Sequence, residues 1–160
     1  MWVALYIGSI VLVNWMFLAL PAVPTALGDI YYANFVVGGI FVLRDYAQRQ
    51  IGHYVLLATL VGGVLTYVMV DPVIATASLA AFFVSETLDW GIYSFTRRPL
   101  QERILYSSLL AAPFDTLVFQ SLANYLTPAS FSLEVASKFI GVAIVWWLLR
   151  RRWAASQTQG

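Results

Sequence analysis

The sequence contains no cysteine and a single histidine, His53. The absence of cysteine excludes disulfides, thiolate metal sites and cysteine nucleophiles, and one histidine excludes a histidine-rich metal site. The sequence has no HExxH motif, and its intramembrane aspartates lack the glycines expected of a paired-aspartate protease. These residue types favour a protein that is not an enzyme, has no catalytic residue, binds no metal and carries no cofactor.

Charged residues are also scarce, at 11% of the chain, whereas hydrophobic residues make up 61% and the mean hydropathy is +0.77. An average soluble domain is about 45–50% apolar. A soluble core of this length cannot hide so much apolar surface, so we expect a multi-pass protein of the cytoplasmic (inner) membrane, surrounded by the lipid bilayer. The first apolar segment lacks a basic n-region and contains Asn14, which favours a retained helix over a cleaved signal peptide.

Six segments are long enough to cross the bilayer, for which about 20 apolar residues are needed. Helices are expected, because lipid cannot satisfy free backbone N–H and C=O groups. We therefore predict an all-α integral membrane protein, a compact bundle of about six transmembrane helices that forms a single domain over residues 1–160. The helices are predicted at residues 3–23, 30–48, 51–70, 74–95, 104–125 and 132–149, and residues 150–160 as a short basic cytoplasmic tail.

Basic residues alternate along the chain in a pattern that predicts orientation, because cytoplasmic loops carry an excess of lysine and arginine. One predicted side holds Arg44, Arg49, Arg97, Arg98, Arg103 and Arg150 to Arg152. The other side holds Asp29, Asp71, Glu134 and Lys138. This pattern predicts an even number of helices with both termini in the cytoplasm. The terminal arginines are interpreted as a stop to translocation, and we expect no nucleic-acid partner.

Several acidic residues lie well inside the predicted helices, namely Asp45, Glu86, Asp89 and Asp115. A charged side chain at a helix centre costs roughly 2.5 to 3.5 kcal/mol, and such residues usually mark a functional site. Glu86, Asp89 and Tyr93 are offset by three and seven positions, so they share one helical face. Structural interpretations stay open, since Arg44 can pair with an acid merely to lower the cost of insertion, and Asp115 can cap backbone groups freed by a proline kink.

The acids outnumber the bases that could be buried with them, so a ligand rich in N–H donors is expected to meet some of them. A carboxylate accepts two hydrogen bonds at once from the N1–H and 2-amino edge of a guanine-like ring. Aromatic faces stack on flat bases wherever proteins hold them unstacked. Phe82, Trp90, Tyr93 and Phe119 are candidates for that contact.

The ordered motifs of the chain resemble those of the VUT family. They are "FVLRDYAQRQIGH", "ASLAAFFVSETLDWGIYSFTRR", "YSSLLAAPFDTLVFQ" and the lysine of "SKFIG". VUT proteins are membrane proteins associated with vitamin uptake and with the uptake of queuosine precursors such as 7-cyano-7-deazaguanine. The resemblance implies a small helical-bundle transporter that imports a deazapurine base.

The resemblance and the stacking argument together give one set of expected substrate-binding residues. That set is Arg44, Asp45, Gln48, Ser85, Glu86, Asp89, Trp90, Tyr93, Asp115, Phe119 and Lys138. Glu86 and Asp89 are expected to face a central cavity, with Asp115 either completing recognition or pairing with a base. Ser108 stands where the family often has asparagine, which puts the exact specificity in question.

Two other functions stay open at this point. One is a substrate-binding subunit of an energy-coupling-factor vitamin importer, which would need a partner transmembrane subunit and ATPases. The other is a structural membrane protein, for which neutralising Glu86 or Asp89 would change stability but no transport. The sequence leaves energy coupling open between proton symport and facilitated diffusion. Small-residue pairs such as Gly38–Gly39 permit close helix packing, so a homo-oligomer also stays open.

Overall fold

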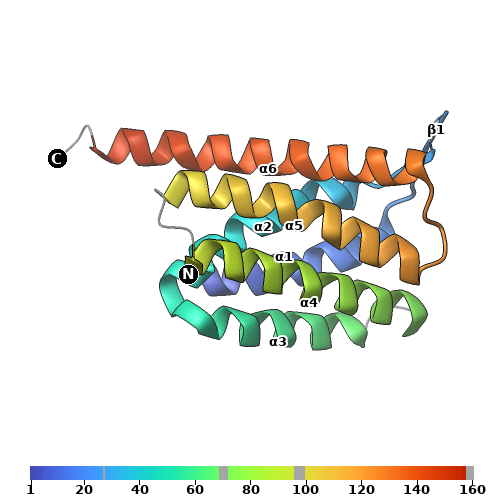
Figure 1. Cartoon of the computed structure of the whole chain (residues 1–160), viewed down its shortest axis with the longest axis horizontal. Helices are drawn as coiled ribbons and strands as arrows, with labels where there is room; N and C mark the ends of the chain where they lie inside the picture. The colour runs from blue at the N-terminus through green and yellow to red at the C-terminus, as the bar shows by residue number, and fades with distance from the viewer. Residues whose placement is uncertain (27, 69–71, 96–99, 158–160) are drawn as a thin grey trace.

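A computed structural model describes residues 1–26, 28–68, 72–95 and 100–157, and its main elements are six α-helices (Figure 1). These are α1 (Trp2–Ala19), α2 (Tyr32–Ile51), α3 (Val55–Tyr67), α4 (Pro72–Phe95), α5 (Leu100–Leu122) and α6 (Pro128–Gln157). A single 3-10 turn, η1 (Gly52–Tyr54), joins α2 to α3. The helices lie side by side, roughly parallel to one axis, and successive helices run in opposite directions. The predicted all-α fold class is confirmed.

A small antiparallel hairpin of β1 (Val23–Thr25) and β2 (Gly28–Ile30) connects α1 to α2 and was not predicted. It shortens the first helix, which ends at Ala19 instead of the predicted residue 23. The Thr25 hydroxyl donates a 2.6 Å hydrogen bond to the Gly28 carbonyl across the turn. Gly28 has φ of 128°, a backbone conformation that favours glycine. At the other end of the chain, α6 continues as a helix through the predicted tail to Gln157.

The bundle carries its polar residues inside and its apolar residues outside, as expected of helices surrounded by lipid. Arg44, Glu86 and Asp89 are fully buried, whereas large apolar side chains such as Leu12 and Phe83 are exposed. Within the described residues, three helical stretches are long and apolar enough to cross a membrane: Trp2–Ala19, Tyr32–Tyr67 and Pro128–Leu149. The two remaining helices, α4 and α5, carry most of the buried acids, so the count of six spans stays a prediction.

The beginning of α1 and the end of α6 lie at the same end of the bundle, and the hairpin lies at the opposite end (Figure 1). The Trp2 backbone N–H donates a 3.1 Å hydrogen bond to Gln50, which places the end of α2 beside the start of α1. The arrangement agrees with an even number of crossings. The cytoplasmic placement of this end stays a prediction, and Asp71, Arg97 and Arg98, on which it partly rests, lie outside the described residues.

Helix α2 is the most enclosed element, and it meets α6 through glycines at very close range. A Cβ atom added to Gly38 would overlap the backbone carbonyl of Lys138, and one added to Gly141 would overlap that of Phe35. Only residues without a side chain allow two helices to approach this closely. The approach fixes the position of Lys138 relative to α2 and therefore its position in the bundle interior.

Replacing Gly38 with leucine is expected to prevent the α2–α6 contact. Overpacking typically costs ~1–3 kcal/mol, and we expect the cost here at or above the upper end because the obstacle is backbone that cannot rotate away. Thermal unfolding of the purified protein in detergent would measure it. Gly8→Leu is the matched control, since a Cβ at Gly8 has nothing within 4 Å. Equal thermal stability of the two variants would contradict this packing.

Candidate functional site

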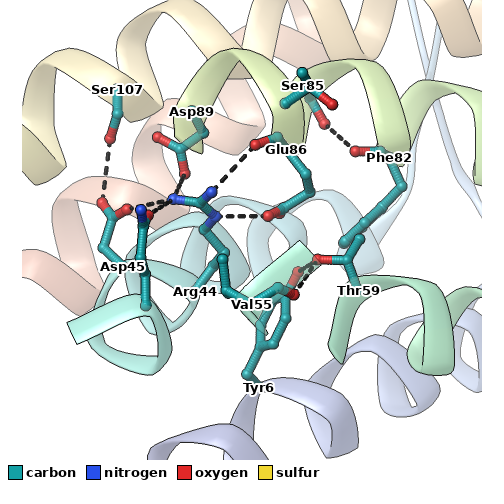
Figure 2. Close-up of polar contacts among 12 residues, drawn as sticks. Tyr6, Arg44, Asp45, Val55, Thr59, Phe82, Ser85, Glu86, Asp89 and Ser107 are labelled. Carbon is teal, nitrogen blue, oxygen red and sulfur yellow. Dashed lines mark hydrogen bonds and ion pairs between the residues drawn. The ribbon is translucent and has the colours of Figure 1, made fainter. Parts of the chain in front are cut away.

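The Arg44 side chain of α2 lies at the centre of a buried ionic cluster, shown in Figure 2. Its Nε is 2.7 Å from Glu86 Oε2, and its Nη1 is 3.0 Å from Asp45 Oδ1 and 3.3 Å from Asp89 Oδ2. All four side chains have an exposed fraction of 0%. We call Arg44, Asp45, Glu86 and Asp89 the arginine cluster. The predicted face of Glu86 and Asp89 on α4 therefore meets a guanidinium of α2.

Further hydrogen bonds hold the arginine cluster in place. Arg44 Nη1 donates to Gln48 Oε1 at 2.5 Å, and Nη2 donates to the Glu86 backbone carbonyl at 3.1 Å. The Ser107 hydroxyl of α5 donates to Asp45 Oδ2 at 3.1 Å. The cluster thus ties α2, α4 and α5 together. The guanidinium of arginine suits this position because its donors form a planar fork, whereas a lysine ammonium could not reach all of these acceptors at once.

A second ionic centre surrounds Lys138 of α6, in the half of the bundle nearer the hairpin. Its Nζ lies 2.6 Å from Glu134 Oε1, 2.7 Å from Asp115 Oδ2 and 2.8 Å from the Thr116 hydroxyl. The Gln120 amide donates to the other Glu134 oxygen at 2.8 Å. We call Lys138, Asp115 and Glu134 the lysine cluster. It joins α5 to α6, so the Glu134–Lys138 pair is part of the interior and not a plain interfacial pair.

A cavity of about 290 Å³ lies next to the lysine cluster. Helices α1, α2, α4, α5 and α6 all contribute to its wall, which combines aromatic and aliphatic side chains with a few polar ones. Its lining residues include Phe17, Tyr31, Asn34, Phe82, Asp115, Phe119, Tyr125, Glu134 and Lys138. Such a combination of apolar surface with a few convergent polar groups is the usual composition of a small-molecule site.

One polar atom in the cavity wall lacks a partner. Asn34 is only 3% exposed, and its Oδ1 has no hydrogen-bond partner in the described part of the protein. Buried polar atoms are nearly always satisfied, and an unsatisfied one costs about 1–3 kcal/mol. Asn34 Oδ1 therefore presents an acceptor that a bound molecule with an N–H group would satisfy.

The structure divides the predicted binding residues into three groups. Asp115, Phe119 and Lys138 line the cavity, and Ser85 donates a 3.2 Å hydrogen bond to Asp115 Oδ1. Arg44, Asp45, Gln48, Glu86 and Asp89 form the arginine cluster and its support. These residues are not part of the cavity lining, and their contact with substrate stays a prediction.

The third group, Trp90 and Tyr93, lies near the end of α4. Trp90 Nε1 donates to His53 Nδ1 at 2.7 Å, and the Arg103 guanidinium lies 4.6 Å from the centre of the Tyr93 ring. Neither ring lines the cavity, whose aromatic residues are Phe17, Tyr31, Phe82, Phe119 and Tyr125. The set predicted from the sequence included neither Asn34 nor Glu134, which both line the cavity. The signal for Asn34 was an amide within an otherwise apolar helix start.

Comparison with protein families gives one match, to the family described as "Putative vitamin uptake transporter", over residues 1–158. The chain belongs to this family. The match covers both ionic clusters and the cavity, so the vitamin uptake transporter family supplies the general function: small-molecule transport across a membrane. The comparisons with curated proteins and with solved structures found no match.

Replacing Arg44 with glutamine is expected to destabilise the protein strongly, because three enclosed carboxylates lose their common counter-ion. Breaking a buried ion pair costs about 3–5 kcal/mol when one charge is left uncompensated. Thermal unfolding in detergent should give the highest melting temperature for Arg49→Gln, which alters an exposed arginine. Arg44→Lys should melt at a lower temperature, and Arg44→Gln at the lowest. An Arg44→Gln variant as stable as Arg49→Gln would show that the cluster does not hold the bundle together.

Proposed function

We propose that this member of the vitamin uptake transporter family imports a queuosine precursor, a deazapurine base such as 7-cyano-7-deazaguanine. The observation that carries the proposal is the composition of the cavity wall. It brings together the unsatisfied acceptor of Asn34, the carboxylates of Asp115 and Glu134, and five aromatic side chains. A flat ring with several N–H donors on one edge complements such a wall.

The carboxylates at the cavity are suited to read that donor edge. Asp115 Oδ2 binds Lys138, while Oδ1 receives only the 3.2 Å hydrogen bond from Ser85. The Ser85 hydroxyl also lies 3.1 Å from the Phe82 carbonyl, to which it can turn. Asp115 can then accept N–H groups from the ligand, and hydrogen bonds to a charged partner contribute about 1.5–3 kcal/mol each. Lys138 fixes the position of the carboxylate through its ion pair with Oδ2.

Phe119 is placed to orient the flat ring of the bound base. It lines the cavity one turn after Asp115 on α5, and its ring meets that of Tyr125 edge-on at 5.9 Å between centroids. Stacking on an aromatic face is worth about 1–3 kcal/mol per base and tolerates any flat ring. Stacking therefore supplies affinity, whereas the carboxylate and Asn34 supply discrimination for a guanine-like edge.

The size of the cavity fits a small bicyclic ligand. Pockets for drug-sized molecules span roughly 300–1,000 Å³, and this one lies at the small end. A deazapurine base is small enough to fit within this volume, whereas a large vitamin with an extended side chain is not. The cavity lies nearer the hairpin, so under the predicted orientation the base enters from outside the cell.

Asp115→Asn is expected to lower import of 7-cyano-7-deazaguanine on the order of tenfold or more, since the amide loses the charge that strengthens the hydrogen bonds. The test uses bacteria that can neither make queuosine precursors nor import them. These cells express the chain and receive the base at low concentration. Queuosine in tRNA is then followed by its slower migration in boronate gels.

Asp29→Asn is the matched control, because Asp29 is exposed in β2 and does not line the cavity. It should support queuosine formation at the wild-type level. No queuosine in cells with membrane-inserted wild-type protein would overturn the deazapurine assignment and direct the search to a panel of vitamins. Normal import by a well-expressed Asp115→Asn variant would overturn the role of Asp115.

A further inference from the structure

The arginine cluster contains more negative charge than its cation can neutralise. Asp45, Glu86 and Asp89 together carry three formal negative charges when ionised, and Arg44 carries one positive charge. Among the described residues, no other base lies within ion-pair distance of these carboxylates. A fully enclosed carboxylate without a counter-ion costs several kcal/mol, so the excess of two negative charges calls for further positive charge in the cluster.

The hydrogen-bond pattern indicates where that charge is missing. Glu86 Oε1 and both oxygens of Asp89 have no hydrogen-bond donor in the described part of the protein. The Asp45 and Asp89 carboxylates both approach the same Arg44 nitrogen, Nη1, at 3.0 Å and 3.3 Å, so they share one cationic donor. An ionised carboxylate only accepts hydrogen bonds, whereas a protonated carboxyl group can also donate one.

The surrounding groups supply no alternative to a proton. The Tyr6 hydroxyl of α1 lies beside Glu86 and is bonded to Thr59 of α3 at 2.7 Å, and Ser107 of α5 donates to Asp45. Both are neutral side chains. In the described residues, no group of three or more acidic or histidine side chains is arranged to hold a metal ion.

We propose that the arginine cluster is a proton-binding site and that the proton moves together with the imported base. One proton bonds to a carboxylate oxygen of Asp89, Glu86 or Asp45 when the cluster is accessible from the outside, and it leaves to water on the other side. This inference rests on the proposed function and assigns the cluster to the co-transported ion, with the base in the cavity.

Two helices connect this cluster to the cavity. On α4, Phe82 lines the cavity, Ser85 bonds to Asp115 in its wall, and Glu86 follows with its carboxylate on Arg44. On α2, Asn34 and Val37 line the cavity, and Arg44 lies two turns further along the same helix. Since a helix moves as a rigid body, a shift of α4 on binding the base also changes the geometry around Glu86 and Asp89.

Proteoliposomes that contain the purified protein distinguish the ion from the substrate. Exchange of labelled 7-cyano-7-deazaguanine across the membrane at equal pH needs no driving force and reports binding and translocation. Accumulation of the same base under an imposed gradient, acidic outside, reports proton coupling. Sodium is absent in one series and present as a gradient at equal pH in another. A pH-sensitive dye enclosed in the vesicles records proton entry when the base is added.

Wild-type protein is expected to accumulate the base several-fold under the proton gradient, with proton entry, and not under the sodium gradient. Asp89→Asn and Glu86→Gln carry an amide that resembles the protonated carboxyl, so they should still exchange the base while accumulation falls to the level without a gradient. Asp29→Asn, in the exposed hairpin, should accumulate like the wild type.

Three results would overturn the proposal. The first is exchange of the base by wild-type protein with neither accumulation nor proton entry under the proton gradient. The second is accumulation driven by sodium. The third is gradient-driven accumulation that survives in both amide variants. By contrast, the absence of exchange by folded wild-type protein at equal pH would overturn the proposed function itself, and this inference with it.

Discussion

An arginine side chain enclosed among membrane helices has to be neutralised on every side, and this constraint determines the arrangement of the bundle around Arg44. Its guanidinium takes acceptors from its own helix, from α4 and, through Asp45 and Ser107, from α5. The three helices can satisfy it only at one relative depth and rotation. The position of α4 in turn places Phe82 and Ser85 at the cavity.

The two ionic clusters differ in a way that suits two different tasks. Asp115, Glu134 and Lys138 line a cavity in which a molecule can meet them. The arginine cluster has no exposed side chain, and its excess carboxylates face each other. A small, mobile charge reaches such a place more readily than an organic molecule does. The positions proposed for the base and the proton are linked by α4, which would give a transporter a simple physical basis for coupling their movement.

Much of this fold was predictable from the sequence, because helix length and hydropathy follow directly from the thickness of a bilayer. The face shared by Phe82, Glu86, Asp89 and Tyr93 was also predictable, since helical spacing determines direction around the axis. Depth along the axis was harder to use. At 1.5 Å per residue, this stripe extends roughly 16 Å, and its members meet the cavity, Arg44 and Arg103 in turn.

Partners across helices could not be obtained from spacing within one helix. Glu86 lies 42 positions after Arg44, and nothing in either local pattern specifies the other. The hairpin was missed because strands of three residues have no periodicity to detect. The hydrogen bond from Trp90 to His53 could not be predicted, since an aromatic residue on a membrane helix has the same local signal beside a ligand or beside another side chain.

The order of residues along the chain also affects how the protein is made. Ribosomes synthesise α2 before α4, so Arg44 leaves the ribosome before Glu86 and Asp89 do. Asp45 and Gln48, one position and one turn away, are the described partners that accompany it from the beginning. They lower the cost of inserting a lone cation, and the later arrival of α4 completes its neutralisation. The adjacent arginine–aspartate pair therefore serves biogenesis as well as the finished bundle.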